Sequence, residues 1–237
     1  QQNQITGFIN STAEALENIL NGIFLVQEAS LRTMDFVISF GERNSAAIIS
    51  AYMNSIGMNT SFLDARKIIE TNDDFGAAKV NFATTYSKIN AHFKNSNAIQ
   101  IVTGFIGSTP NGITTTLGRG GSDYTAAILG AALQADCIEI WTDVDGVLTA
   151  DPRKVKGAFS IEKMTYAEAM EMSHFGAKVI YPPTIHPAFE SKIPLLIKNT
   201  FNPNHIGTFI SEPPSPNDKI VQGISSINNI ALLTLIG

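Results

Sequence analysis

A run of small and polar residues, Thr114 to Ala127, has the composition of an anion-binding loop. Its glycines precede an alanine-rich stretch typical of a helix, so the first amide groups of that helix would point at a ligand. Arg119 adds a planar guanidinium that suits a carboxylate or a phosphate. The alternative is an ordinary tight turn, in which Ser122 caps the helix and Asp123 complements its dipole. The glycine spacing differs from those of the dinucleotide-binding and P-loop fingerprints.

A second group of polar residues follows a strand-like apolar segment. Thr142 and Asp143 come directly after that segment, Asp145-Gly146 comes next, and Arg153 lies a few residues further on. Ligands bind at the carboxyl ends of strands in open α/β sheets, so this loop is a candidate ligand site. Taken alone, Asp145-Gly146 is a favourable turn and nothing more.

Two charged side chains are candidates on less specific grounds. Lys178 lies in the segment Phe175 to Val179, where it can reach a phosphate or be an ordinary solvated lysine. Glu42 interrupts an apolar segment, so its carboxylate needs a positive partner. The amino group of an amino-acid substrate would serve, and so would a salt bridge to Arg43 or to a neighbouring helix.

Composition excludes several classes of function. The chain has 237 residues, of which 44% are apolar and 16% charged, with a net charge of -5. Such a surface does not suit nucleic acid or an anionic membrane as a partner. One cysteine, Cys137, predicted to be buried, permits neither a disulfide nor a cysteine metal cluster, and the four histidines show no metal-ligand spacing. No membrane span or signal peptide is evident, so we expect a cytoplasmic protein.

The periodicity of apolar residues predicts alternating helices and strands, which is typical of an α/β fold. Capping boxes at Ser11 and Thr165 each predict a helix start. Further helices are expected at Met34–Ile56, Asn81–Lys94, Ser122–Gln134 and from Thr184. Strands are expected at Ser61–Asp64, Ala98–Ile106, Thr114–Leu117, Cys137–Trp141, Pro194–Lys198 and Gly207–Ile210, with a hairpin turn through Pro110-Asn111-Gly112. Three prolines within residues 212–218 predict a linker, and Ile230–Ile236 alternates like a strand.

Taken together, these segments resemble the amino acid kinase family, and within it the aspartate kinases. The resemblance covers Phe36 to about Ile236 and rests on motifs in a specific order: Phe40 to Ser45, Gly104 to Gly107, Leu117 to Ala126, Trp141 to Arg153 and Phe175 to Val179. The segments Glu139 to Gly146 and Leu196 to Thr200 are most similar to the kinase part of bifunctional aspartokinase/homoserine dehydrogenases.

The resemblance implies a three-layer sandwich with a mostly parallel central sheet. Residues 1–211 would form the catalytic domain, 212–218 the linker, and 219–237 the first strand of an ACT-type regulatory domain. The N-terminal strand and the Lys-Phe-Gly-Gly-Thr-Ser loop of aspartate kinases have no counterpart here, and the first residue is not Met. We therefore expect a piece of a longer protein that is inactive or severely impaired alone.

The implied reaction is ATP- and Mg²⁺-dependent phosphorylation of the side-chain carboxylate of L-aspartate to 4-phospho-L-aspartate, the first step towards lysine, threonine and methionine. By resemblance, Arg119 binds the substrate's α-carboxylate and Glu42 its α-ammonium group. Phe105, Gly121 and Ser122 would line the pocket, and Asp123 would organise phosphoryl transfer.

The remaining implied roles concern the nucleotide and the assembly. Thr142, Asp143, Arg153, Lys178 and Val179 would bind ATP, with Lys178 also acting on the phosphates. No residue is assigned as a metal ligand. The family often has tyrosine at position 148, where this chain has leucine, so a hydroxyl contact to the nucleotide is lost. An allosteric amino-acid end product and a homo-oligomer are further expectations. The alternatives are a kinase of the same family that acts on glutamate, N-acetylglutamate or a nucleoside monophosphate, or a non-catalytic amino-acid sensor.

Overall fold

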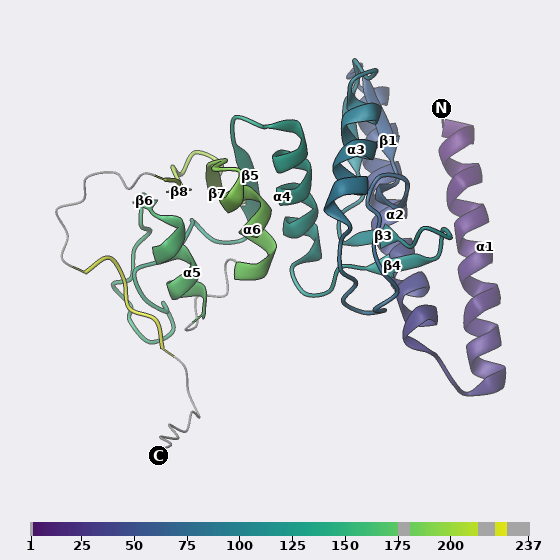
Figure 1. The fold of residues 1–237 in the computed structure, drawn as a ribbon, viewed down its shortest axis with the longest axis horizontal. Helices are drawn as coiled ribbons and strands as arrows, with labels where there is room; N and C mark the ends of the chain where they lie inside the picture. Colours follow the sequence, from purple (N-terminus) through teal and green to yellow (C-terminus); the bar gives the residue numbers. More distant parts are fainter. Residues whose placement is uncertain (1, 175–180, 213–220, 227–237) are drawn as a thin grey trace. The chain divides into compact units, whose positions relative to one another are not determined.

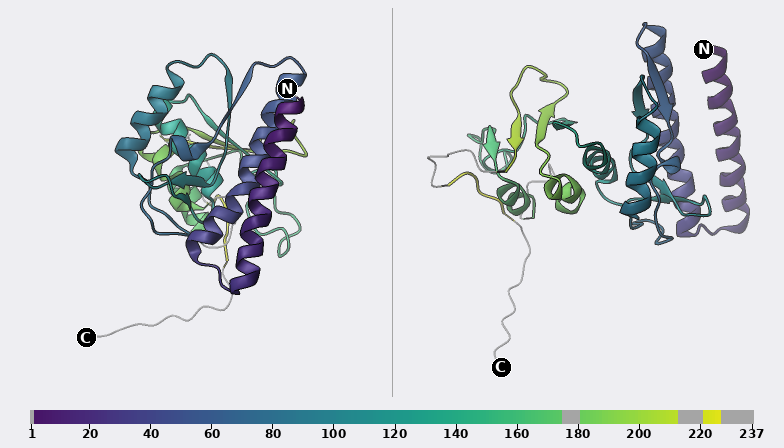
Figure 2. Two further views of the ribbon diagram at one scale, coloured as in Figure 1. Left: turned by 90° about the vertical axis from the view of Figure 1, so that its right-hand side faces the viewer. Right: turned by 45° about the horizontal axis from the view of Figure 1, so that its top comes forward.

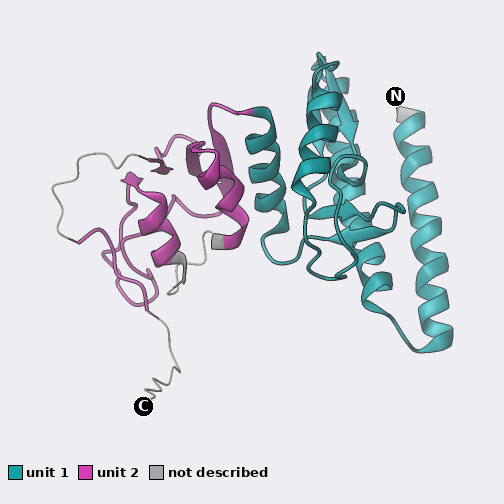
Figure 3. Cartoon of the chain, in the orientation of Figure 1, with its two compact units in different colours: residues 1–133 teal, residues 134–237 magenta. Residues whose placement is uncertain are grey.

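The computed structural model describes residues 2–174, 181–212 and 221–226 (Figure 1). The chain divides into two compact units, residues 1–133 and 134–237 (Figure 3). Apart from Glu212, the predicted linker lies outside the described residues, as does Ile230–Ile236. The assignment of residues 219–237 to an ACT-type domain therefore stays a prediction.

Two long helices begin the first unit, α1 (Gln2–Val26) and α2 (Leu31–Ser55), and they lie side by side and antiparallel (Figures 1 and 2). The prediction of a helix start at Ser11 is wrong, because α1 already runs from Gln2. The Ser11 hydroxyl donates to the carbonyl of Phe8 at 2.8 Å, a bond that serine makes inside helices. The prediction for α2 is confirmed, including its end near Gly57, which has a φ of +90°.

Short strands follow, in two sheets. Strand β1 (Thr60–Leu63) pairs in parallel with β2 (Ile99–Val102), and β3 (Ile106–Ser108) pairs antiparallel with β4 (Thr114–Thr116) through the predicted hairpin turn. A short 3-10 helix, η1 (Ala65–Lys67), follows β1. The prediction of one strand over Ala98–Ile106 is wrong, because the chain turns between β2 and β3.

Helices α3 (Phe82–Phe93) and α4 (Gly121–Leu133) complete the first unit and pack against each other. Asn81 caps α3 by accepting a hydrogen bond from the Thr84 amide, which confirms the predicted helix start. The core beneath these elements is aliphatic. Its buried members include Leu63, Ile68, Ile69, Ile89, Ile106, Leu117 and Ile128.

The second unit contains one four-stranded sheet, in the order β5-β7-β8-β6. Its strands are β5 (Ile138–Thr142), β6 (Lys163–Met164), β7 (Leu195–Asn199) and β8 (Thr208–Ile210). The helices are α5 (Tyr166–His174) and α6 (Pro182–Glu190), the latter beginning two residues before the predicted Thr184. Cys137 is exposed, against expectation, because it lies in the short loop between α4 and β5 and not in the strand.

The predicted capping box at the start of α5 is confirmed. The Glu168 carboxylate accepts from the Thr165 amide at 2.7 Å, and the Thr165 hydroxyl accepts from the Glu168 amide at 3.1 Å. Each side chain thus satisfies a backbone group that the helix leaves without a partner.

The strands form a more mixed arrangement than the predicted mostly parallel sheet. The described strands lie in three sheets, with parallel pairs β1-β2, β5-β7 and β6-β8 and antiparallel pairs β3-β4 and β7-β8. A parallel pair needs a long crossover connection, and the connections after β3 and β7 are too short for one. None of the described helices is both long and apolar enough to cross a membrane.

Candidate active site

A cavity of about 580 Å³ in the first unit brings together the residues predicted to bind the substrate. They come from α2, from the turn before β3 and from the loop that opens α4. The five residues are Glu42, Phe105, Arg119, Gly121 and Ser122, and Asp123, predicted to organise phosphoryl transfer, lines the same cavity. A carboxylate and a guanidinium on one cavity suit a ligand that carries both charges, as an amino acid does.

The loop that opens α4 forms part of the wall of this cavity. Gly118 and Gly120 both have positive φ values, +75° and +68°, which favour glycine. The helix then starts at Gly121, so Ser122 lies inside it and the alternative role of Ser122 as the cap is wrong. The first amides of any helix have no partner within it and carry a partial positive charge, so this end of α4 favours an anion.

Close packing fixes Phe105 against the start of α4. Phe105 has a φ of +69°, a conformation that costs free energy in a residue with a side chain. Its amide donates to the Thr125 hydroxyl at 3.0 Å, and its carbonyl accepts from the Leu117 amide at 2.8 Å. A Cβ atom on Gly121 would lie 2.7 Å from Cδ2 of Phe105, so any other residue there would force Phe105 to shift. Strained residues held in this way are common at functional sites.

The two acidic side chains predicted to act in the site, Glu42 and Asp123, are partly desolvated. Burial raises the pKa of Glu42, against the opposing effect of a backbone hydrogen bond at Gly104, and burial also raises the pKa of Asp123. A nearby positive charge stabilises the ionised form of a partly buried carboxylate. A ligand ammonium group or a cation in the cavity would supply it.

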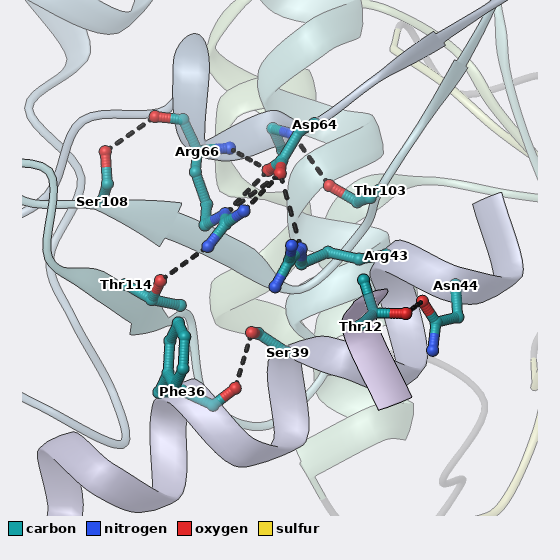
Figure 4. Close-up of polar contacts among 11 residues, drawn as sticks. Thr12, Phe36, Ser39, Arg43, Asn44, Asp64, Arg66, Thr103, Ser108 and Thr114 are labelled. Carbon is teal, nitrogen blue, oxygen red and sulfur yellow. Dashed lines mark hydrogen bonds and ion pairs between the residues drawn. The ribbon is translucent and has the colours of Figure 1, made fainter. Parts of the chain in front are cut away.

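Arg43 is engaged with a carboxylate other than that of Glu42. Its Nε lies 3.7 Å from the Asp64 carboxylate (Figure 4). Its guanidinium lies 4.9 Å from the centre of the Phe40 ring. Arg66 also contacts Asp64, with its Nε donating at 2.9 Å, and its Nη1 donates to the Thr114 hydroxyl at 2.9 Å. The alternative in which Arg43 neutralises Glu42 is therefore not supported.

This cluster also ties α2 to the end of β1. Burial acts to raise the pKa of Asp64, but the hydrogen bonds and charge of Arg66, together with the charge of Arg43, hold that pKa below its ordinary value. Burial and the charge of Arg66 lower the pKa of Arg43. Asp64 was not among the predicted site residues: Arg66 lies only two residues away, but the ion pair with Arg43 of α2 leaves no signal in the sequence.

Asp35 lines the same cavity, although it was not among the predicted site residues. Asp35 precedes Glu42 by seven residues, two helical turns, so both side chains lie on one face of α2. That spacing was the available signal.

A second cavity, of about 340 Å³, lies within the second unit, where β5 ends. Three predicted nucleotide-binding residues line it, Thr142, Asp143 and Arg153. Leu148 lines it as well. This is the position at which the family often has a tyrosine, whose hydroxyl this chain lacks. The polar group at the carboxyl end of this buried strand therefore does border a cavity of ligand size.

Asp151 orients Arg153 on the rim of this second cavity. The guanidinium donates to the carboxylate from Nε at 3.0 Å and from Nη2 at 2.7 Å. These bonds, with one from the Arg153 backbone amide, lower the pKa of Asp151 to about 2, and the same side-chain bond raises the pKa of Arg153. Arg153 is exposed, so it can also meet a phosphate.

Asp145-Gly146 forms the turn that its sequence predicts. The Asp145 carboxylate accepts from the side-chain amides of Asn199 at 2.9 Å and Asn202 at 3.1 Å. Gly146 has a φ of +103°, and a Cβ atom there would lie 2.5 Å from the Thr208 hydroxyl. These residues shape the loop that carries Asp143.

The remaining predicted residues, Lys178 and Val179, lie outside the described residues. Within the described part of the chain, no group of three or more His, Cys, Asp or Glu side chains is placed to hold a metal ion.

Comparison with known proteins identifies the family that this fold and these cavities belong to. The model of the amino acid kinase family matches residues 7–199, and the chain belongs to that family. The chain is 40% identical over 227 residues to Aspartokinase 1, chloroplastic, of Arabidopsis thaliana, a match that covers 94% of this chain and 40% of that protein.

Two further comparisons agree with this assignment. The chain is 37% identical over 235 residues to a bifunctional aspartokinase/homoserine dehydrogenase of Buchnera aphidicola, covering 99% of this chain and 29% of that protein. The crystal structure of E. coli aspartokinase III in complex with aspartate and ADP matches with a TM-score of 0.87 and 36% identity, covering 94% of this chain and 50% of that one. The chain thus spans half or less of the length of these relatives.

Proposed function

We propose that the full-length protein is an aspartate kinase, which transfers the γ-phosphoryl group of ATP to the side-chain carboxylate of L-aspartate. The observation that carries this proposal is the single cavity lined by Glu42, Arg119 and Asp123 at the start of α4. The relatives named aspartokinase support it at 37 to 40% identity.

Recognition of aspartate would use the opposite charges of the first cavity. The Arg119 guanidinium suits the α-carboxylate, because its donors match the two oxygens. Glu42, whose pKa is raised by burial, gains from the α-ammonium group. Phe105, Gly121 and Ser122 complete the cavity wall. The E. coli relative was crystallised with aspartate and ADP, as its description states, which supports both ligands.

The nucleotide would bind to the second unit. Thr142 and Asp143 lie where β5 ends, and Arg153 is held on the rim of the same cavity by Asp151. Lys178 and Val179 are assigned to ATP on the family resemblance. The apolar side chain of Leu148 would contact the nucleotide without a hydrogen bond.

Magnesium fits this proposal as a partner of the phosphates. Mg²⁺ at nucleotide sites takes one or two carboxylates and otherwise phosphate and water oxygens, so it does not require a cluster of three acidic side chains. Asp143 in the second unit and Asp123 in the first are carboxylates on the two candidate cavities. When bound, Mg²⁺ would offset negative charge on the phosphates.

The chemistry places few demands on side chains. A carboxylate is already an anionic nucleophile at neutral pH, so no general base is needed, and the difficulty is charge repulsion. Arg119, the amides that open α4 and Lys178 would reduce that repulsion and orient the reactants. The product is an acyl phosphate, which reacts with water, so exclusion of water from the site would protect it.

Regulation and assembly remain further proposals. One solved structure of E. coli aspartokinase III contains lysine and aspartate, which supports an amino-acid effector for this protein as well. An ACT-type regulatory domain after residue 219, a homo-oligomer and a cytoplasmic location are proposed from the family resemblance.

A substrate panel tests the proposal. The full-length protein, supplied with magnesium and ATP, should release ADP with L-aspartate and much more slowly with L-glutamate or N-acetyl-L-glutamate. Glu42→Gln should raise the aspartate KM, because its neutral amide no longer attracts the ammonium group. Turnover of glutamate with aspartate untouched would reassign the substrate, and calorimetry that shows amino-acid binding without magnesium-ATP binding would identify a sensor.

A further inference from the structure

The carboxylate of Asp35 is almost completely buried, with 1% of the residue exposed, and it accepts hydrogen bonds from two separate backbone segments. Its Oδ2 accepts from the amide of Gly76 at 3.0 Å and from the amide of Thr116 at 3.0 Å. Its Oδ1 accepts from the Thr116 hydroxyl at 2.7 Å. Three donors therefore converge on one side chain of α2.

The two segments bonded to Asp35 flank the start of the loop that carries Arg119, residues 117–120. Thr116 ends β4, three residues before Arg119, and its carbonyl accepts from the Ala78 amide at 2.8 Å. The residue after Gly76, Ala77, packs against the left-handed Gly118, where an added Cβ atom would lie 3.2 Å from the Ala77 Cβ. Asp35 thus holds Thr116, from which the Arg119 loop starts, and Gly76, whose neighbour Ala77 packs against that loop.

The same helix carries Glu42 on the same cavity. Aspartate recognition by the proposed function requires a fixed spacing between Glu42, which takes the ammonium group, and Arg119, which takes the α-carboxylate. α2 carries the first residue, and the loop after β4 carries the second. The Asp35 bonds join these elements directly, inside the cavity wall.

We propose that Asp35 is a positioning residue that sets the spacing of Glu42 and Arg119 and thereby the affinity for the amino-acid substrate. This inference rests on the proposed function for its kinetic consequence and on the hydrogen bonds alone for its structural one. The oxygens of Asp35 are bonded to Gly76 and Thr116, so it acts through α2 and the end of β4.

The chemistry of these hydrogen bonds explains why a carboxylate is needed. Two amides and one hydroxyl all donate, and an ionised carboxylate offers two accepting oxygens and no donor. An asparagine has one accepting oxygen, and its NH₂ group would face a donor. Charge-assisted bonds are also stronger than neutral ones, so the substitution weakens all three contacts.

The test compares Asp35→Asn, Thr116→Val and the exposed control Asp73→Asn in the full-length protein. Asp35→Asn should raise the aspartate KM by about tenfold, equivalent to roughly 1.4 kcal/mol, and leave the ATP KM within about twofold. Thr116→Val removes one donor and should give a smaller rise in the same parameter. Asp73→Asn should match the wild type in every measurement.

Hydrogen exchange without any substrate provides an independent readout. In Asp35→Asn the amides of Gly76 and Thr116 should exchange faster, and the faster exchange should extend through residues 117–122. If the wild type does not turn over aspartate, the proposed function fails while this measurement still tests the Asp35 hydrogen bonds. Unchanged exchange in residues 117–122, or faster exchange with an unchanged aspartate KM, would overturn the inference. A lowered melting temperature with both KM values unchanged would also overturn it, by showing a role in stability alone.

Discussion

Replacing Gly121 by alanine tests whether the contact between the start of α4 and the Phe105 turn shapes the substrate cavity. The new Cβ atom would lie 2.7 Å from Phe105 Cδ2 and 3.2 Å from both Phe105 Cα and Leu117 Cβ. The first distance falls about 0.7 Å short of ordinary contact. The Phe105 ring can turn, but its backbone is fixed by bonds to Thr125 and Leu117, so the turn itself must yield.

The size of the effect follows from two opposing terms. Overpacking of this kind costs about 1–3 kcal/mol. Alanine in a helix gains up to about 1 kcal/mol over glycine, and less at the first helical position. We therefore expect Gly121→Ala to lower the free energy of unfolding by about 1–2 kcal/mol. Because Phe105 and Arg119 line the displaced wall, the aspartate KM should also rise.

Gly41→Ala is the matched control, because it makes the same substitution in α2 beside Glu42, with no atom within 4 Å of the new Cβ. It should stabilise the protein by up to about 1 kcal/mol and leave the aspartate KM unchanged. Urea unfolding followed by circular dichroism, together with ADP-release kinetics, measures both quantities. If Gly121→Ala were as stable as Gly41→Ala and bound aspartate normally, the packing argument would be refuted.

Three further predictions concern charged residues. Arg119→Ala should raise the aspartate KM at least about tenfold and change the ATP KM little, whereas an unchanged aspartate KM in steady-state kinetics would contradict its role. Asp64→Asn leaves two arginines without their shared carboxylate and should lower the free energy of unfolding by about 2–4 kcal/mol in urea denaturation, against about 0.5 kcal/mol or less for Asp73→Asn. The folded pKa of Asp64 lies below its unfolded value of about 3.9, so its contribution to the free energy of unfolding is complete above that pH and is lost as the pH falls further. In Asp64→Asn, the free energy of unfolding should therefore lack this pH-dependent loss. Arg153→Ala should raise the ATP KM and return the pKa of Asp151 from about 2 towards its ordinary value in an NMR titration; an Asp151 pKa that stays near 2 would show that the guanidinium is not its cause.

Local chemistry explains which helix starts were predictable. The same capping-box pattern was read at Ser11 and at Thr165, and only the second is a cap. The residues directly before Thr165 form the short strand β6. The residues before Ser11 contain no proline and continue the helical pattern. A capping box therefore marks a start only where the preceding chain cannot itself be helical.

Long-range contacts explain the break in the predicted strand at Ala98–Ile106. The apolar residues there suit a continuous strand, but the Thr103 hydroxyl accepts from the Ala65 amide at 2.8 Å, and Phe105 turns into the left-handed region. The Ala65–Thr103 bond joins positions 38 residues apart, and the bond from the Phe105 amide to Thr125 joins positions 20 apart. Sequence periodicity reports the local environment of a segment, so it could not indicate this turn.

The two sets of site residues differ in the same way. Arg119, Ser122 and Asp123 could be found from one short segment, because an anion-binding helix start is a local device of glycines, small residues and a charge. Asp35 could be suspected only from its spacing with Glu42 on α2, because the Thr116 groups that donate to it lie 81 positions away. Asp64 is held mainly by Arg66, two residues away, and the sequence could not indicate its ion pair with Arg43 on α2. Part of the predicted ligand site is thus local in sequence, whereas the Asp35 contacts that join it to α2 are not. It follows that a motif match alone is a weak guide to activity in this family, because a chain can keep Arg119 and Glu42 and lose their spacing through one buried aspartate.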